Sequence, residues 1–190
     1  FGLRASWAAG VRSRLSAEDR KTLEEADKLF GVPLHWIYTL PSPKDGSGAL
    51  WALRQLPAGQ RLLALALKQD TNPVWMQILQ GVAEKQSWDN RDLECLQSDE
   101  CQEYSHKKKL RTEDLINILN IWAHPVDFDQ RYLAALQSYY QSFFAEEEKR
   151  ILPALREGLE QAQKLAQQMS LMQLFEQLSQ GLHDANLTSY

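Results

Sequence analysis

The residues best suited to hold a metal ion are two cysteines and a histidine in the middle of the chain, Cys95, Cys101 and His106. A closed zinc site needs four ligands, usually with its cysteines spaced two to four residues apart. Here five residues separate the cysteines, four more precede the histidine, and no fourth ligand stands out. We therefore expect no bound metal and interpret Cys95 and Cys101 as two unpaired thiols in a helical segment.

The sequence contains none of the common motifs for catalysis or nucleotide binding. A phosphate-binding P-loop, a glycine-rich dinucleotide turn, a GxSxG nucleophile elbow and an HExxH zinc motif are all missing. His124 and Asp127 flank Pro125 at a helix junction, where we expect Asp127 to cap the following helix. His35, beside Trp36 in an apolar stretch, is interpreted as a core histidine. We predict that the protein is not an enzyme and needs no cofactor.

The stretch YYQSFFAEEEKRILPALREGL, residues 139–159, combines two aromatic pairs with three glutamates and an internal proline. Glu147 falls on its apolar stripe, so it either lies in a pocket, where a carboxylate needs a partner, or sits at the wet edge of the stripe. Aromatic residues at this spacing either line a cavity or form plain core. Our candidate ligand-binding residues are Tyr140, Phe143, Glu147 and Trp122.

Length and charge favour a globular protein without an obvious nucleic-acid surface. A chain of 190 residues buries roughly 70% of its unfolded surface, and its two cysteines favour a reducing, cytoplasmic compartment. The net charge of −4 has the wrong sign for gripping phosphates, and the one basic run, HKKKLR at 106–111, is interpreted as a solvated face. The longest aliphatic run, 62–67, is too short to cross a membrane. Because the chain starts at Phe1 without a leader, we expect a piece of a longer protein.

The elements that must position these residues are predicted to be helices. Leucine occurs 30 times, whereas valine, isoleucine and threonine together occur 16 times, and no stretch of strand length alternates polar and apolar residues. Ser16 with Asp19 predicts a helix that ends at Gly31. The turn-forming stretch PSPKDGSG, residues 41–48, predicts a loop, and a short helix should follow up to Pro57.

Helix signals continue through the middle of the chain. The run LLALAL, residues 62–67, predicts a helix that is central in the bundle, and Asn72 before Pro73 predicts the start of the next one. The charged stretch 87–109 is weakly patterned and is expected to be irregular. Thr112 is expected to cap the helix after it.

The last helices are predicted to be long and apolar on one side. A pattern through Leu133 and Leu136 runs from Asp127 past Pro153, where a lost hydrogen bond and a ring clash, costing about 3 kcal/mol, should bend or break the helix. The predicted fold is therefore all-α, an irregular multi-helix bundle with a long, proline-kinked helix near the C-terminus.

One more helix is predicted at the end of the chain. Ser170 with Gln173 forms a capping-box pattern, and the leucines of 171–182 form a narrow stripe that we expect to contact a partner chain or a further module.

The order of these features resembles a known arrangement. SWAAGVRSRLSAEDRKTLEEADKLFG is followed by HWIYTLPSP and ALWALRQLPAGQRLLALAL, and YYQSFFAEEEKRILPALREGLEQAQKLAQQ later precedes SLMQLFEQLSQGL. Over most of the chain this pattern resembles the long N-terminal helical domain, of unknown function, found in some bacterial regulators of the ArsR-like winged-helix group. The resemblance implies a DNA-binding winged helix downstream of residue 190 and action as a homodimer. The cysteine pair of arsenic-sensing members belongs to the winged helix, so Cys95 and Cys101 do not inherit that role.

Three functions remain open. The one we predict is a single, non-catalytic regulatory domain, residues 1–190, that senses a small-molecule effector or dimerises and contacts DNA only through the downstream winged helix. The second is a freestanding helical module for protein interaction. The third is an unrecognised enzyme that uses carboxylates in the bundle interior. A reading frame that runs past Tyr190 into a winged helix would separate the first from the second.

Overall fold

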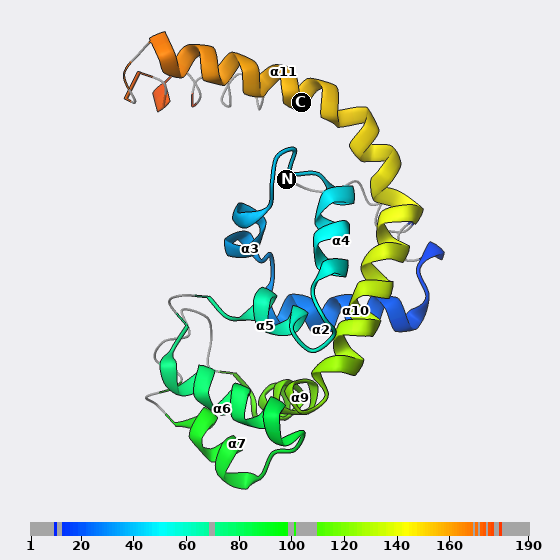
Figure 1. Ribbon diagram of the computed structural model, residues 1–190, viewed down its shortest axis with the longest axis vertical. Coiled ribbons are helices and arrows are strands. Elements are labelled where there is room, and N and C mark those ends of the chain that lie inside the picture. The colour runs from blue at the N-terminus through cyan, green and yellow to red at the C-terminus, as the bar shows by residue number, and fades with distance from the viewer. Residues whose placement is uncertain are drawn as a thin grey trace. The chain divides into compact units, whose positions relative to one another are not determined.

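The computed structural model describes Gly10, Cys101 and residues 13–68, 71–98, 110–168, 170, 172–173, 175–176 and 179. Every regular element within these residues is a helix and none is a strand (Figure 1), so the predicted all-α multi-helix fold is confirmed. In chain order the elements are α2 (Ala17–Phe30), α3 (Leu34–Thr39), α4 (Gly46–Gln55), α5 (Arg61–Ala66), α6 (Pro73–Lys85), α7 (Asn90–Gln97), α9 (Thr112–Ala123), α10 (Pro125–Tyr139), the π-helix η1 (Tyr140–Phe144) and α11 (Ala145–Gln168).

Helix α2 begins and ends where the sequence predicted. The Ser16 hydroxyl accepts a hydrogen bond from the backbone nitrogen of Asp19 at 2.9 Å, which satisfies an N–H group that has no partner within the helix. At the other end Gly31 has a φ of 59°, which glycine adopts without strain, and its N–H donates to the Asp27 carbonyl. Local capping therefore fixes both ends.

The predicted loop of residues 41–48 is shorter than expected. Helix α4 already begins at Gly46, so the prediction is wrong for its last three residues. The reason is Asp45, whose carboxylate accepts hydrogen bonds from the backbone nitrogen of Gly48 at 2.7 Å and from the hydroxyl of Ser47 at 2.9 Å. This N-cap outweighs the preference of glycine for turns. The helix ends before Pro57, as predicted.

A lysine side chain closes the C-terminal end of α3. The Lys44 ammonium donates to the backbone carbonyls of Ile37 at 3.3 Å, of Tyr38 at 2.9 Å, and of Leu40. The last carbonyls of a helix have no N–H donor within it, so they need such a partner. Lys44 thereby ties this short helix to the turn ahead of α4.

Helix α6 starts as the sequence predicted. The side-chain oxygen of Asn72 accepts a hydrogen bond from the backbone nitrogen of Val74 at 2.8 Å, and Pro73 is the first helical residue.

The stretch 87–109, predicted to be irregular, contains helix α7, so that prediction is wrong for residues 90–97. Asp89 and Asp92 form a reciprocal capping box: each side chain accepts a hydrogen bond from the other's backbone nitrogen, at 3.3 Å and 3.0 Å. Two aspartates here do the work that serine and glutamate usually share.

Thr112 does not cap α9, contrary to our prediction; it is the first helical residue, and Arg111 occupies the cap position. The Thr112 hydroxyl accepts a hydrogen bond from the side-chain nitrogen of Gln97 at 3.0 Å, so it serves a contact with α7. The helix ends at Ala123, close to the predicted end near Pro125.

Asp127 is likewise not a cap. Helix α10 begins two residues earlier, at Pro125, because proline fits the first helical turn, and Asp127 lies in that first turn. The helical backbone then widens into η1 and continues as α11. Pro153 lies inside α11 without ending it, and the α11 ribbon curves in Figure 1.

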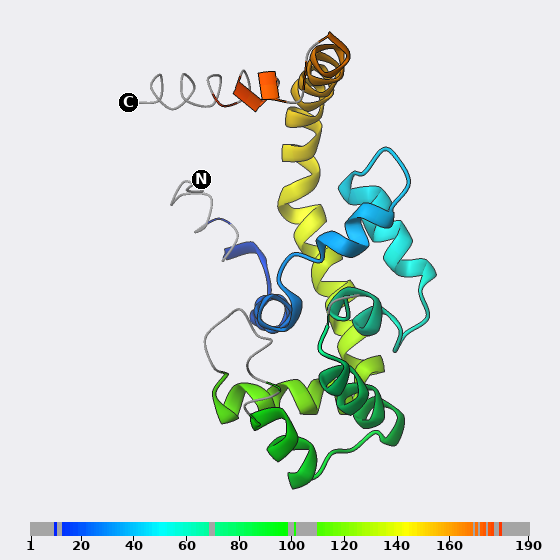
Figure 2. The same cartoon turned by 90° about the vertical axis from the view of Figure 1, so that its left-hand side faces the viewer.

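The hydrophobic core is built mainly on α9, with α10 and the helices around these two. Helix α10 packs across α2, which Figure 2 shows nearly end-on, and α9 packs against α6 and α7. Leu62 and Leu65 are almost fully buried, which confirms the central place predicted for the helix at 62–67. The buried cluster consists of Ala26, Leu53, Leu62, Leu65, Leu79, Val82, Leu96, Leu115, Leu119, Ile121, Trp122, Ala123, Phe128 and Tyr132.

The chain divides into two compact units, Phe1–Ala145 and Glu146–Tyr190. The core cluster belongs entirely to the first unit. The second unit contains nearly all of α11 and the short helical pieces after it. The single regulatory domain predicted for 1–190 stays a prediction.

Candidate functional site

Asp129, on α10, is a fully buried carboxylate with three backbone partners. Its Oδ2 accepts hydrogen bonds from the backbone nitrogens of Gly59 at 2.6 Å and Arg61 at 3.0 Å. Its Oδ1 accepts one from the backbone nitrogen of Leu62 at 2.8 Å. These N–H groups open the N-terminus of α5, so the carboxylate caps a helix that lies nearly 70 residues earlier in the chain.

The electrostatics of Asp129 are set by two opposing effects. Burial raises the pKa of the carboxyl, and the three backbone N–H donors, helped by Arg61, lower it without cancelling the effect of burial. The Arg61 side chain is itself buried, and its Nε donates to the Leu53 carbonyl at 2.8 Å. The arrangement suits the fixing of α5 against α10, because both carboxylate oxygens are already occupied by the backbone.

Sequence reasoning missed Asp129 because the predicted stripe on α10 started at Leu133, one helical turn after it. The predicted stripe ran through Leu133 and Leu136, which are only partly buried. The buried side carries Pro125, Phe128, Asp129 and Tyr132. A carboxylate that recurs with apolar residues at helical spacing was the available signal.

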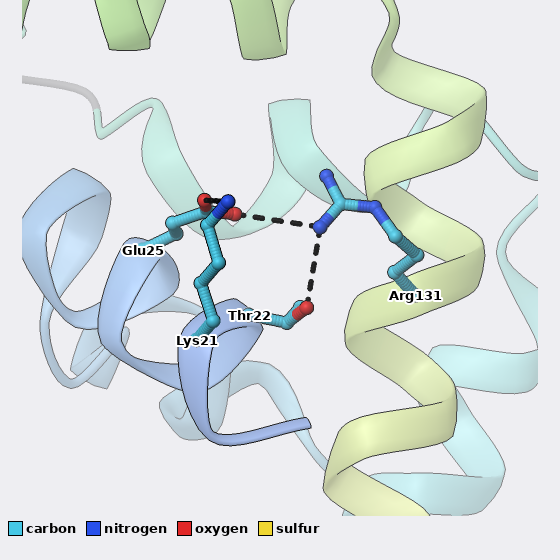
Figure 3. A network of polar contacts seen from close by, with 4 residues as sticks. All are labelled: Lys21, Thr22, Glu25 and Arg131. Atoms are coloured by element: carbon cyan, nitrogen blue, oxygen red, sulfur yellow. Dashed lines mark hydrogen bonds and ion pairs between the residues drawn. The ribbon is translucent and has the colours of Figure 1, made fainter. Parts of the chain in front are cut away.

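A second polar contact joins α10 to α2 and is drawn in Figure 3. Arg131 Nη1 donates to the Thr22 hydroxyl at 3.2 Å and to Glu25 Oε2 at 3.4 Å. Lys21 approaches the same glutamate at 3.8 Å from the solvent side. Thr22 is buried and Glu25 nearly so, whereas 40% of the Arg131 side chain is exposed. The network orients the two helices at the edge of the core.

Two of the predicted ligand-binding residues, Tyr140 and Phe143, lie in the π-helix η1. π-turns inside α-helices are rare, and those that occur often lie at functional sites. Arg14 reaches this turn from the N-terminal side: its Nη1 donates to the Ser142 carbonyl at 3.5 Å, and its guanidinium lies 5.5 Å from the centre of the Phe143 ring. The wide turn therefore offers both a carbonyl and an aromatic face to a cation.

The aromatic rings of this segment contact one another. Tyr139 lies 6.0 Å from Phe143 and 6.5 Å from Phe144, and Tyr140 lies 6.2 Å from Phe144, measured between ring centres. Burial raises the pKa of Tyr139. The rings of Tyr139, Tyr140, Phe143 and Phe144 are all half-buried, so they form an aromatic cluster and not an enclosed core.

The other two predicted ligand-binding residues do not belong to this aromatic cluster. Trp122 is 1% exposed and belongs to the hydrophobic core around α9. Glu147 belongs to the second unit, where its Oε2 pairs with Arg150 Nη2 at 2.6 Å and 40% of its side chain is exposed. The structure therefore brings Tyr140 and Phe143 together in one turn and leaves Trp122 in the core. Of the two alternatives for Glu147, a pocket or the solvent-exposed edge of the stripe, the structure shows the exposed edge.

A groove of about 360 Å³ runs between α2 and α9, and none of the four predicted residues lines it. Its apolar side includes Leu29, Ile118 and Ile121. Charged and polar groups at its rim are Glu25, Asp27, Lys28, Arg111, Asp114 and Asn117. Arg111 and Asp114 pair at 3.0 Å, and this hydrogen bond is the main cause that lowers the pKa of Asp114.

The predicted core histidine, His35, is only half satisfied. Its Nε2 lies 3.0 Å from the Ala64 carbonyl, which joins α3 to α5. Its Nδ1 is buried and has no hydrogen-bond partner in the described part of the chain.

The thiols lie in different environments, with Cys95 exposed and Cys101 buried. His106 and the basic stretch through Lys109 lie outside the described residues. Within the described residues, no three histidine, cysteine, aspartate or glutamate side chains gather as metal ligands would. None of the helices in this part combines the length and the apolar character needed to cross a bilayer.

No protein family, no curated protein and no solved structure matches the chain.

Proposed function

We propose that the chain is a non-catalytic, helical regulatory domain of a bacterial transcriptional regulator of the ArsR-like winged-helix group, and that it acts as a homodimer in the cytoplasm. The resemblance of the sequence and the all-α fold support this proposal. DNA binding then belongs to a winged helix downstream of residue 190.

The proposal that the domain is not catalytic rests on the environment of Asp129. An enzyme built on interior carboxylates would need such a group to reach substrate. Asp129 is fully buried, and both of its oxygens accept hydrogen bonds from the start of α5. The Asp129 carboxylate therefore serves to hold α5 and α10 together.

An effector of this domain would bind in the groove between α2 and α9. The groove, about 360 Å³, falls at the lower end of the range for ligand pockets, about 300–1,000 Å³. Its apolar side and its rim of both charges, with Asp27 and Lys28 adjacent on α2, suit a small molecule that has an apolar body and polar ends.

Native mass spectrometry of the purified protein tests the effector. We expect a co-purified small molecule in the wild type and its loss in Ile118→Trp, which fills the groove. Gln130→Trp, a substitution at an exposed position of α10, is the control and should retain the molecule. Retention of the same molecule by Ile118→Trp would place the effector elsewhere.

A gel-shift comparison tests the regulator itself, with the promoter of its own gene at near-physiological salt. We expect the longer protein to retain the promoter specifically. The 190-residue piece should not, because its net charge is −4 and its one basic run supplies few phosphate contacts. Failure of the longer protein to bind would remove the regulator proposal, and specific binding by the piece alone would overturn the division of labour.

A freestanding interaction module is the second candidate. It is favoured by the exposed apolar side chains of α11, Leu155 and Leu159. A gene that ends near residue 190 would select this candidate, and a winged helix further along the gene would select the regulator.

A further inference from the structure

Helix α11 carries an apolar seam that its own unit does not cover. No apolar residue in the described part of the second unit is buried. Leu155 and Leu159 are 60% and 59% exposed. Such a helix gains little stability in water by itself, because most helical stability in proteins comes from the packing of an amphipathic face.

The spacing of the apolar residues along this seam indicates which kind of structural element can pack on it. Apolar residues recur at intervals of three and four along α11: Leu152, Leu155, Leu159, Ala162 and Ala166. This is the heptad period at which two helices interlock side chains along a narrow stripe. The fitting partner is therefore another helix.

We propose that the seam from Leu152 to Ala166 pairs with the same seam of a second copy of this chain, in antiparallel orientation. Within α11 the five glutamates are nearly matched by four lysines and arginines, so the surface is close to neutral and does not repel itself. A strongly acidic or strongly basic partner would meet no surface of opposite net charge on α11.

The distribution of charge selects the antiparallel orientation. The first turn of α11 is acidic, with Glu146 and Glu147, and a parallel pair would set these turns side by side. An antiparallel pair separates them and places the N-terminal end of each helix dipole beside the C-terminal end of the other. In that register Leu155 lies level with Leu159 of the second copy, the two-fold axis passes at Glu157, and Gly158 lies roughly 3 Å along the helix from its own counterpart.

The size of the contact indicates how much of the second unit takes part. A helix of 24 residues is roughly 36 Å long, and a stripe about 10 Å wide along it covers less than the roughly 800 Å² per partner of a stable interface. The segment after α11 exposes Met172 and Phe175, at 76% and 60%, and these extend the apolar surface. The predicted leucine stripe of 171–182 falls largely on residues outside the described part.

Sedimentation velocity over a wide range of protein concentration tests the pairing. We expect the wild type to dimerise and the variant Leu155→Glu with Leu159→Glu to bind its copy at least about 100-fold more weakly, because each change places a charge in the seam. Gln161→Glu, which adds a charge to an exposed position of the same helix, is the control and should dimerise as the wild type does. A monomeric wild type, or a double variant that still dimerises, would overturn the pairing.

A disulfide across the symmetry axis tests orientation without depending on stability. A side chain added at Gly158 meets no atom within 4 Å, so Gly158→Cys should fold normally. In a background with Cys95→Ser, which removes the exposed thiol, oxidation should crosslink two chains through position 158. Gln163→Cys, roughly 18 Å from its counterpart along an antiparallel pair but level with it in a parallel one, should give no crosslink, and a crosslink there would overturn the antiparallel arrangement.

The pairing names the surface behind the homodimer of the proposed function, and the two can fail separately. Promoter retention by a longer protein whose double variant also dimerises would remove the pairing and keep the regulator. A dimer that pairs through α11 in a protein that binds no promoter would keep the pairing and remove the regulator.

Discussion

Asp129 Oδ2 lies 2.6 Å from the backbone nitrogen of Gly59, although 70 residues separate them in the chain. With its two companion hydrogen bonds, this contact makes α10 the cap of α5. A helix of only six residues thereby obtains its N-terminal hydrogen bonds from a distant element.

Removal of this cap should cost more than removal of a carboxylate at the surface. Asp129→Ala leaves the buried N–H groups of Arg61 and Leu62 and the partly buried N–H of Gly59 without this acceptor, and we expect the free energy of unfolding to fall by about 3 kcal/mol. Asp127→Ala, an exposed change two residues earlier in the same helix, should cost less than about 1 kcal/mol. Urea denaturation measures both, and equal losses would contradict the role of Asp129.

The Arg131 network should contribute little and should weaken with salt. Arg131→Met removes contacts to Thr22 and Glu25, and we expect a loss of about 1 kcal/mol because the guanidinium is partly solvated. Lys21→Met, at 3.8 Å from the same glutamate and 76% exposed, is the matched control and should change almost nothing. A double-mutant cycle of Arg131 with Glu25 at low and high salt measures the coupling, which should shrink as salt rises.

Tyr132 should make the protein lose stability in alkaline solution. Its ring stacks on Phe128 with centres 5.8 Å apart, and burial raises the pKa of Tyr132 from 10.0 to about 12. The folded state therefore holds the proton more tightly than the unfolded chain, so stability falls as pH rises between about 10 and 12, by about 2–3 kcal/mol from this group.

Urea unfolding at pH 9.5 and 11.5 compares the wild type with Tyr132→Phe. The variant lacks the titrating phenol and should lose about 2 kcal/mol less between these two pH values. Identical losses in the two proteins would show that Tyr132 ionises as freely in the folded chain as in the unfolded one.

Chelation should leave the melting temperature unchanged. The spacing of Cys95, Cys101 and His106 fits no closed zinc site, so no structural metal should be available to remove. A scan with and without a strong chelator checks this expectation. A large drop in melting temperature would show that these residues hold a metal after all.

Some helix starts could be predicted from the rule that a cap accepts a hydrogen bond from a backbone nitrogen two or three residues ahead, although the equally local caps of Asp45 and Asp89 were missed. Ser16 with Asp19, Asn72 with Val74, and Ser170 with Gln173, whose backbone and side chains bond reciprocally, all follow this rule. Thr112 breaks it, because its hydroxyl bonds to Gln97 on another helix. A hydroxyl near a helix start signals a cap only when no tertiary partner competes for it.

The candidate site could be predicted only in part. The aromatic spacing indicated Tyr140 and Phe143, which do share one turn, but nothing local to the sequence revealed that this turn is a π-helix. Asp129 escaped because its partners, at Gly59 to Leu62, become visible only when α5 and α10 are brought together. The groove between α2 and α9 has the same origin, since it exists only between helices far apart in the chain.

The cap on α5 also bears on the order in which the protein folds. A six-residue helix is far below the length that persists alone in water, and the closure of a loop of 70 residues must precede its N-terminal hydrogen bonds. Helix α5 therefore has no route to form early and waits for α10 to dock. Substitutions within α5 should then speed unfolding far more than they slow folding. Substitutions in the folding nucleus, the part of the fold already formed in the transition state, should mainly slow folding.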